Sequence, residues 1–224
     1  MSSVVNFIHN IMTQHPADYI QRLISEGEHV HQDFKFEISD ARKIAKSISA
    51  FANTEGGRLL VGVKDNGKIA GVRSEEEIYM IEAAAQRYCQ PPVDLHTYIY
   101  KVEGKDVLEV VIDESPRKPV YALDAEERRW AYVRIKDENI LASPIHLNIW
   151  QHNRHEEKVI IAYTQREQQV LNLLAQHPCL TLNQCQRLTR MNRKLITNLL
   201  ADFIRFGLVE QVFTGHAFYF RLKD

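Results

Sequence analysis

The stretch from residue 50 to residue 72, which reads AFANTEGGRLLVGVKDNGKIAGV, constrains the fold of this chain more than any other. Apolar residues upstream of its Gly-Gly pair recur at helical spacing, which predicts a helix over residues 41–52. The two glycines end that helix, because glycine readily adopts the left-handed conformation that is common at helix C-termini. Residues 59–63 are a continuous apolar run, typical of a strand covered on both faces, and the Asp-Asn-Gly that follows predicts a hairpin turn.

The same stretch resembles the signature of the Schlafen core domain, the Alba-like DNA-binding domain that is also called divergent AAA. An upstream E-F-K element of that family corresponds here to residues 33–35, and a downstream Y-x-R strand corresponds to residues 132–134. The resemblance covers residues 15–150 and implies a Schlafen-type, Alba-like mixed sheet with helices. The predicted elements agree, because runs of strands follow helices without strict β-α-β alternation. We therefore expect an α+β first domain over residues 1–150.

Further helices and strands are predicted around this stretch. Helices are expected over residues 4–12, 17–24 and 75–88, and a capping box formed by Ser74 and Glu77 should begin the last of these. Strands are expected over residues 30–37, 96–102, 107–112, 119–123 and 130–135. The strand over residues 30–37 has mostly apolar even positions and polar odd positions, so we expect its odd face to meet a cleft or water.

Charge and pattern both change near residue 150. Residues 151–224 carry ten Lys and Arg against six Asp and Glu, a net of +4, whereas residues 1–150 carry eighteen against twenty-three, a net of −5. The polar residues 151–163 are the best candidate for a linker. Residues 164–224 predict three helices and a β-hairpin, which is the order of a winged helix-turn-helix domain, and this segment resembles one. A nucleic-acid surface is therefore expected on the C-terminal domain.

The composition argues against a membrane-spanning protein, a secreted protein and a cysteine metal site. Of the 224 residues 45% are hydrophobic and 25% are charged, which is typical of a globular protein with one large or two small domains. The three cysteines show no metal-ligand spacing and indicate reduced thiols. No apolar run approaches the length of a membrane span and no signal peptide is evident, so we expect a cytoplasmic protein without a membrane partner.

Three carboxylates near the central strand, those of Glu28, Asp33 and Asp65, are the candidate catalytic and metal-ligating groups. Adjacent strands would bring them together as hard oxygen ligands for Mg²⁺ or Mn²⁺, which could activate water against a phosphodiester. Lys35, on the same face as Asp33, would hold a phosphate. The resemblance implies the same acidic set, because three acidic residues form such a site in the Schlafen ribonucleases, although the family usually has Glu at position 33. The alternative is that Asp65 makes a turn and Asp33 pairs with Lys35.

The third predicted helix of the C-terminal domain, over residues 192–206, provides the clearest candidate for a nucleic-acid surface. The residues expected on or near its outer face, with two arginines just before it, are Arg187, Arg190, Asn192, Arg193, Lys194, Thr197 and Asn198. Arg, Asn and Thr near the N-terminus of a recognition helix can reach base edges, and Lys or Arg can neutralise phosphates. The alternative is a winged helix used for dimerisation or docking.

Two other patterns are weaker candidates. The Gly-Gly pair lacks the Lys of a phosphate-binding loop and ends a helix, whose C-terminus repels phosphate, so no ATP site is expected. Histidines at positions 29 and 31, and at 152 and 155, have spacings that can bind metal, but such histidines are more often simply solvated.

Together these features favour a DNA-binding protein, a transcriptional regulator that acts as a homodimer and prefers DNA over RNA. The first domain would serve as an oligomerisation, effector or second nucleic-acid surface. The rival hypothesis is a metal-dependent endoribonuclease that acts on structured RNA through the three carboxylates, with Mg or Mn as cofactor. A protein-interaction module that binds no nucleic acid is the third hypothesis.

Overall fold

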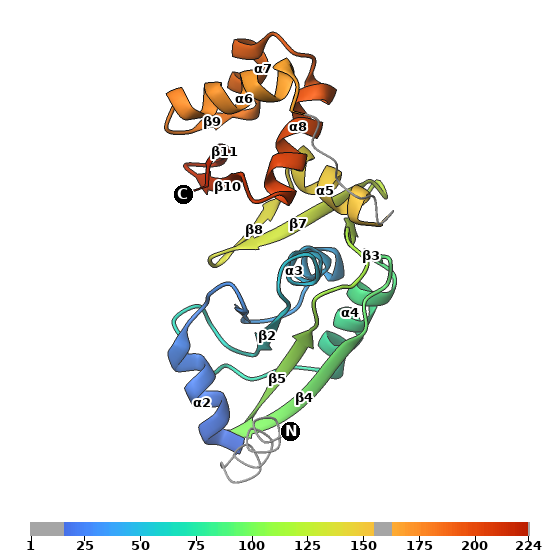
Figure 1. Cartoon of the computed structure of the whole chain (residues 1–224). Coiled ribbons are helices and arrows are strands. Elements are labelled where there is room, and N and C mark those ends of the chain that lie inside the picture. Colours follow the sequence, from blue (N-terminus) through green and yellow to red (C-terminus); the bar gives the residue numbers. More distant parts are fainter. Residues whose placement is uncertain (1–15, 155–162, 224) are drawn as a thin grey trace, which may run out of the picture. The chain divides into compact units, whose positions relative to one another are not determined.

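The computed structural model describes residues 16–154 and 163–223 (Figure 1). The chain separates into two compact units, the first comprising Met1–Pro116 and Val120–Leu141, the second Arg117–Pro119 and Ala142–Asp224. The first domain is expected to end at residue 150, whereas in the structure the residues after Leu141 belong to the second unit. The helix predicted over residues 4–12, and most of the predicted linker, lie outside the described residues.

Within the described residues, the first unit contains two four-stranded sheets. One has the order β1-β2-β5-β4, in which β1 and β2 are parallel and the other neighbours are antiparallel. Its strands are β1 (Gln32–Lys35), β2 (Gly57–Val61), β4 (Leu95–Val102) and β5 (Lys105–Ile112). The other is antiparallel, in the order β3-β6-β7-β8, with β3 (Cys89–Gln90), β6 (Tyr121–Leu123), β7 (Arg129–Ile135) and β8 (Glu138–Leu141). This is the mixed α+β architecture that the sequence predicts, with the short β3 and β8 in addition.

Three helices accompany these sheets in the described part of the first unit: α2 (Pro16–Glu26), α3 (Ala41–Asn53) and α4 (Glu75–Gln86). α3 lies between the two sheets and contacts strands of both (Figure 1). A helix covered on opposite sides must bury apolar or fully hydrogen-bonded side chains nearly all round, and nine of the thirteen residues of α3 are buried. Ser49 is one of them, and its hydroxyl donates to the carbonyl oxygen of Val120 at 2.8 Å.

The signature at the end of α3 has a structural explanation. Asn53 is buried, and its side-chain amide joins α3 to the second sheet by donating to the carbonyl oxygens of Val120 (2.8 Å) and Tyr132 (3.0 Å). Its amide oxygen accepts from the N–H of Val120 at 2.7 Å, so the polar group is satisfied. A Cβ at Gly57 would lie 2.3 Å from the ring of Phe51, so only glycine fits against that ring. These residues therefore serve packing and the tight turn into β2.

Side-chain caps begin two of the helices, but the capping box expected at a third is not formed. Asp40 caps α3, and a capping box of Thr164 and Glu167 begins α6. Ser74, expected to form a capping box with Glu77, makes no cap hydrogen bond. The Glu77 carboxylate is buried instead and accepts the backbone N–H of Ile38 at 2.9 Å, which ties the segment before α3 to α4.

The second unit contains four helices and one three-stranded antiparallel sheet within the described residues. The helices are α5 (Pro144–Arg154), α6 (Gln165–Gln176), α7 (Leu182–Thr189) and α8 (Arg193–Arg205). The strands are β9 (Leu180–Thr181), β10 (Val209–Thr214) and β11 (Ala217–Leu222), in the order β10-β11-β9. One apolar core joins them, in which Val170, Cys185, Phe203 and Phe220 are buried together with Ile145 of α5.

The elements α6, α7, α8, β10 and β11 follow the order that the sequence analysis associates with a winged helix-turn-helix domain. α5 packs against α8 as a further helix of this unit. Within the ranges that the structure describes, no helix has both the length and the apolar character needed to cross a membrane.

Candidate functional site

Asp33, expected on an open polar face of β1, lies in the interior of the first unit. It is 4% exposed, and the Nζ of Lys35 lies 2.6 Å from its Oδ2. The Nη2 of Arg134, on β7 of the other sheet, lies 3.4 Å from its Oδ1. The expectation that this face meets a cleft or water is therefore wrong for Asp33, because β7 supplies a cation above it and Ser47 of α3 donates a hydrogen bond to it at 3.5 Å.

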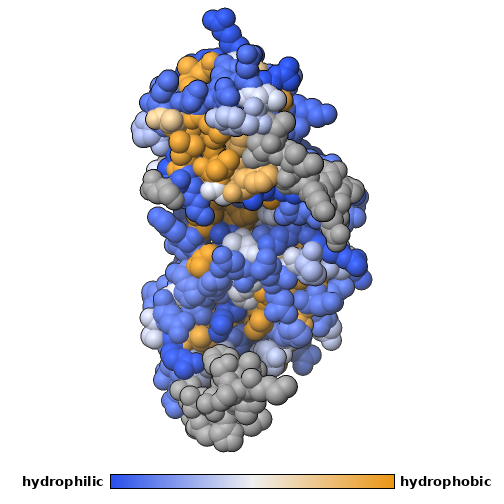
Figure 2. Space-filling model, viewed as in Figure 1, coloured by the Kyte–Doolittle hydropathy of each residue, from blue (hydrophilic) through white to orange (hydrophobic). Residues whose placement is uncertain are grey.

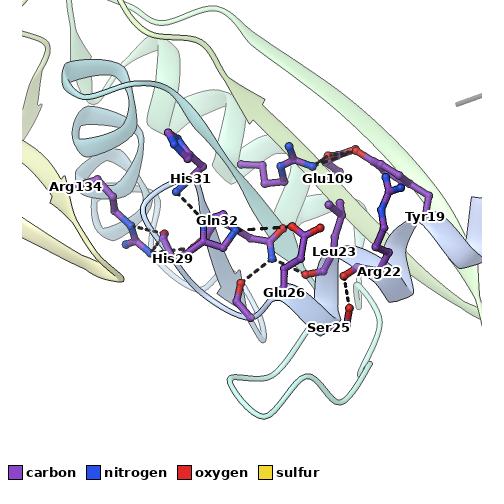
Figure 3. A network of polar contacts seen from close by, with 12 residues as sticks. Tyr19, Arg22, Leu23, Ser25, Glu26, His29, His31, Gln32, Glu109 and Arg134 are labelled. Atoms are coloured by element: carbon purple, nitrogen blue, oxygen red, sulfur yellow. Dashed lines mark hydrogen bonds and ion pairs between the residues drawn. The ribbon is translucent and has the colours of Figure 1, made fainter. Parts of the chain in front are cut away.

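Arg134 is the centre of this buried cluster. It is 3% exposed, and its guanidinium donates to the carbonyl oxygens of Gln32 (3.1 Å) and His29 (3.4 Å), as Figure 3 shows. Its Nη1 donates to Asn139 Oδ1 at 2.9 Å, and Asn139 in turn donates to Ser47. A buried guanidinium needs partners for most of its N–H groups, and here they come from two separate segments of chain, residues 29–33 and Asn139. Arg134 therefore joins residues 29–33, which lead into β1, to the second sheet.

Glu28, the second expected acidic residue, does lie beside Asp33. Its Oε1 accepts the backbone N–H of Phe34 at 2.8 Å, and its carboxyl group is hydrogen-bonded to that of Asp33. Desolvation, followed by this hydrogen bond, raises the pKa of Glu28. Burial alone would raise the pKa of Asp33 as well, but the hydrogen bond from Glu28 and the charges of Lys35 and Arg134 lower it below its usual value. The two carboxyl groups thus favour a state in which Glu28 holds the proton and Asp33 is ionised.

Asp65, the third expected acidic residue, does not join the pair. It is exposed in the turn between Val63 and Ile69, six positions beyond Leu59, the residue that faces Asp33 across the β1–β2 pairing. Among the residues described by the structure, no three His, Cys, Asp or Glu side chains form a group that could hold a metal ion. The expected Mg²⁺ or Mn²⁺ site therefore does not fit these residues, because the oxygens of Asp33 already meet two cations and a hydroxyl.

Lys35 and the paired histidines are also engaged elsewhere. The Nζ of Lys35 pairs with Asp33 and donates to the carbonyl oxygen of Phe34 at 2.9 Å, which opposes the expected role in holding a phosphate. His29 and His31 face different carboxylates, those of Glu26 at 3.9 Å and Glu55 at 3.5 Å. Of the linker histidines, His152 lies against a backbone carbonyl and His155 falls outside the described residues.

A second buried polar cluster lies near α2. Glu109 of β5 is 2% exposed and accepts from the Tyr19 hydroxyl at 2.9 Å (Figure 3). Arg58 Nη1 lies 3.3 Å from the same oxygen. Burial and the neighbouring Glu109 raise the pKa of Tyr19 to about 12, so its hydroxyl remains a donor at neutral pH. In both clusters of the first unit, therefore, a buried carboxylate has a cation and hydrogen-bond donors beside it.

The expected nucleic-acid residues of the second unit gather around the turn between α7 and α8. Arg187, Arg190, Arg193 and Lys194 are all exposed, and none of them pairs with a carboxylate among the described residues. Arg190 has a left-handed backbone (φ 59°) at the end of α7, and Asn192 caps α8 by accepting the N–H of Leu195 at 2.9 Å. The N-terminus of α8 and four basic side chains therefore share one small area of the second unit.

Two residues expected on or near the outer face of α8 are not free there. Thr197 is 9% exposed and lies among the buried residues of the helix. Asn198 is half-buried, and its Oδ1 accepts from Asn148 of α5 at 3.0 Å. The apolar pattern of α8 predicts a helix with one covered face, but α5 packs on it as well. The exposed part of α8 is its beginning, at residues 193 and 194.

Sequence reasoning named Arg134 as part of a family motif and overlooked its role in the cluster. One signal was available: an arginine within the otherwise apolar strand 130–135 is expensive to bury and so indicates a buried acidic partner. Its partner is about a hundred positions away in sequence, and no local pattern identifies it.

Comparison with known proteins gives one match by sequence and several by structure. A sequence model of the family described as Schlafen, AlbA_2 matches residues 28–143, just over half of the chain. No curated protein matches the chain significantly. Among solved structures, the DIP2311 protein from Corynebacterium diphtheriae is similar at 19% identity and a TM-score of 0.43, over 65% of this chain and 29% of that one.

A further solved structure, the N-terminal domain of a RecG-related protein from Nitrosomonas europaea, is similar at 18% identity and a TM-score of 0.41, over 68% of this chain and 98% of that one. The chain thus spans less than a third of the DIP2311 protein and nearly the whole of the RecG-related domain. The family match includes the signature, Glu28, Asp33 and Arg134. The chain therefore belongs to the Schlafen, AlbA_2 family, which supports a function related to nucleic acid.

Proposed function

We propose that this protein binds DNA through its second unit, which acts as a winged helix-turn-helix domain, and that it serves as a transcriptional regulator. The observation that carries the proposal is the set of four exposed basic side chains around the α7–α8 turn, Arg187, Arg190, Arg193 and Lys194. Between Glu167 and Asp202 the chain contains no acidic residue at all. Phosphate groups would therefore meet an uncompensated positive surface there.

The geometry of α8 suits this role. In helix-turn-helix proteins the N-terminal residues of the second helix contact base edges, and basic side chains nearby contact the backbone. Arg193 and Lys194 occupy the first turn of α8, where the helix dipole also favours an anion. Since Thr197 and Asn198 are engaged inside the unit, base contacts would come from the first turn alone, and backbone contacts would dominate the affinity.

The metal-dependent endoribonuclease remains the rival function, and one observation favours it. Glu28 and Asp33 lie beside each other, as two of three expected catalytic acids would need to. Two others oppose it, because Asp65 lies apart in a turn and both Lys35 and Arg134 neutralise Asp33. The first unit is better explained as an oligomerisation, effector or second nucleic-acid surface than as a nuclease.

The proposal includes a homodimer. Two-fold operators match two-fold proteins, and one recognition helix covers only part of a helical turn. In Figure 2 hydrophobic residues gather over the second unit, and its exposed large apolar side chains include Leu188, Phe206 and Leu208. Such side chains are candidates for burial between two copies. Light scattering at micromolar concentration tests this part, since a mass near the 26.0 kDa of one chain would exclude the dimer.

Fluorescence anisotropy tests the proposed function itself. The full chain is titrated against labelled duplex DNA of about 30 base pairs, long enough for two half-sites one helical turn apart, and against tRNA. We expect duplex binding that weakens steeply as salt rises, weaker tRNA binding, and no change in either nucleic acid when Mn²⁺ is added. Cleavage of tRNA that requires Mn²⁺, or the absence of salt-dependent duplex binding, would overturn the regulator in favour of the rival.

A further inference from the structure

β4 forms an open edge of the first sheet. It is the terminal strand in the order β1-β2-β5-β4, and no other strand in the described residues pairs with its outer side (Figure 1). It is eight residues long, without proline, and most of it is exposed. The outer N–H and C=O groups of such a strand are available to a further strand, and proteins usually blunt long edges with charge, proline or bulges. Here Tyr98 and Ile99, at its centre, are 50% and 62% exposed.

A groove of about 570 Å³ lies beside this edge, between β4 and α4. Ile99 lines it from β4, and its pairing partner Leu108, which is buried in β5, also lines it. Ile78 and Tyr79 line it from α4, and Tyr79 is 66% exposed. A strand added to β4 would direct alternate side chains to the face on which this apolar surface is exposed.

The groove carries uncompensated negative charge. Glu75, Glu82 and Asp106 lie along it, and none of the three makes a hydrogen bond or ion pair through its side chain among the described residues. Among the described residues that line the groove the one cation is Arg73, which is already paired with Glu37 at 2.6 Å and lies over the ring of Phe36. The charge left over therefore favours a basic ligand.

We propose that β4 and this groove bind an extended peptide segment of a partner protein by β-strand addition. The segment would place an apolar side chain between Ile99 and Tyr79 and Lys or Arg side chains beside the three carboxylates. Backbone hydrogen bonds to β4 would supply affinity, and the groove would supply specificity, as in other edge-strand recognition. This surface is on the first unit and does not depend on the nucleic-acid function proposed for the second.

Charge argues against a second copy of the chain as the occupant. Antiparallel pairing of β4 with β4 of another copy, about a two-fold axis perpendicular to the sheet, would keep both α4 helices on one face of the joined sheet. The two sets of Glu75, Glu82 and Asp106 would then flank the same seam. Juxtaposed like charges are unfavourable across an interface, whereas a basic peptide meets the same carboxylates with opposite sign.

A displayed library of random 12-mer peptides, selected on the full chain, tests the proposal. We expect enriched peptides with alternating apolar residues and an excess of Lys and Arg. A labelled enriched peptide should bind the Ile99→Thr, Tyr79→Ala double variant about tenfold more weakly, because both apolar anchors of the groove are lost. Both side chains are largely exposed, so the variant should fold as the wild type does.

Matched controls distinguish β-strand addition from nonspecific peptide binding. Tyr98→Thr alters the opposite face of the same strand and should leave affinity unchanged, and Glu82→Gln should weaken binding where Glu76→Gln does not. N-methylation of alternate peptide amides should abolish binding, because it removes the backbone hydrogen bonds of an added strand. Failure to enrich any such peptide, equal loss in Tyr98→Thr, or a dimer that Ile99→Thr dissociates would each overturn the proposal.

Discussion

The two units differ in where some of their charged side chains lie, buried and paired in the first unit and exposed in the second. In the first unit Asp33 of one sheet and Arg134 of the other are buried and form an ion pair. Glu109 is buried against Arg58 and Tyr19. In the second unit the basic side chains of the α7–α8 turn stand in solvent without a carboxylate partner in the described residues. A buried charge without a partner is too costly to retain, whereas an exposed one costs little.

The difference separates structural charge from charge that is available to a ligand. Removing one member of a buried pair should lower stability, and the exposed cations should matter for binding alone. Of the three acidic residues that the sequence suggested as catalytic, Asp33 falls in the first category, whereas Glu28 is partly exposed and Asp65 is exposed. Four measurements test this division, from the largest expected effect to the smallest.

Replacing Asp33 with Asn should have the largest effect. It leaves the buried Arg134 without its counter-charge, and breaking such a pair costs about 3 kcal/mol of unfolding free energy or more. Urea unfolding followed by circular dichroism measures the change. Asp65→Asn is the matched control, since that residue is exposed in a turn and should change stability by less than about 0.5 kcal/mol. Equal effects of the two variants would mean that Asp33 is not a structural charge.

Acid should destabilise the second unit through His146. Burial lowers the pKa of this residue to about 4, below the 6.5 of an exposed histidine, so the folded unit prefers the neutral ring. Its contribution is fully present above pH 6.5 and is lost as the pH falls towards 4, by at most about 3 kcal/mol. Fluorescence of Trp150, whose ring centroid lies 5.6 Å from that of His146, follows the unfolding. His146→Phe should flatten this pH dependence, and an unchanged slope would refute the assignment.

Replacing both Arg193 and Lys194 with Ala should weaken duplex DNA binding without lowering stability. We expect about a tenfold loss of affinity and a reduction of about 2 in the salt slope, since each phosphate contact releases counterions. Anisotropy titrations at several salt concentrations measure both quantities. Lys43→Ala with Arg87→Ala removes the same net charge from exposed positions of the first unit and should leave the slope nearly unchanged. If the two double variants behave alike, the DNA surface is not at α8.

Glu28→Gln should have the smallest effect. The raised pKa of Glu28 means that the folded protein favours its protonated form, whose stabilising contribution is present below the ordinary pKa of 4.5 and is lost as the pH rises through the raised value. Gln resembles the protonated form, so the variant should be as stable as the wild type near pH 7, within about 1 kcal/mol for this partly exposed group. Thermal unfolding between pH 4 and pH 7 measures the change. A loss comparable to that of Asp33→Asn would show that the ionised form of Glu28 is the structural one.

Local patterns in the sequence determined the elements that surround the signature. The spacing of apolar residues before the Gly-Gly pair placed α3, and the apolar run after it placed β2, because each signal depends on neighbours within a few positions. Asp40 and the Thr164–Glu167 box were recognisable caps for the same reason. The short strands β3 and β8 were missed, since two to four residues carry too little pattern to distinguish a strand from a loop.

Only the tertiary structure decided which polar residues are buried and what satisfies them. Asp33 alternates with apolar neighbours as a surface residue would, yet Arg134, far along the chain, covers and neutralises it. Thr197 is polar on a helix with one obvious apolar face, yet that helix is also contacted by α5. The sequence by itself therefore determined the family signature, the α+β class and the basic character of the α7–α8 segment. The tertiary structure determined which of those charges remain free, because the environment of a side chain depends on segments that meet it only after folding.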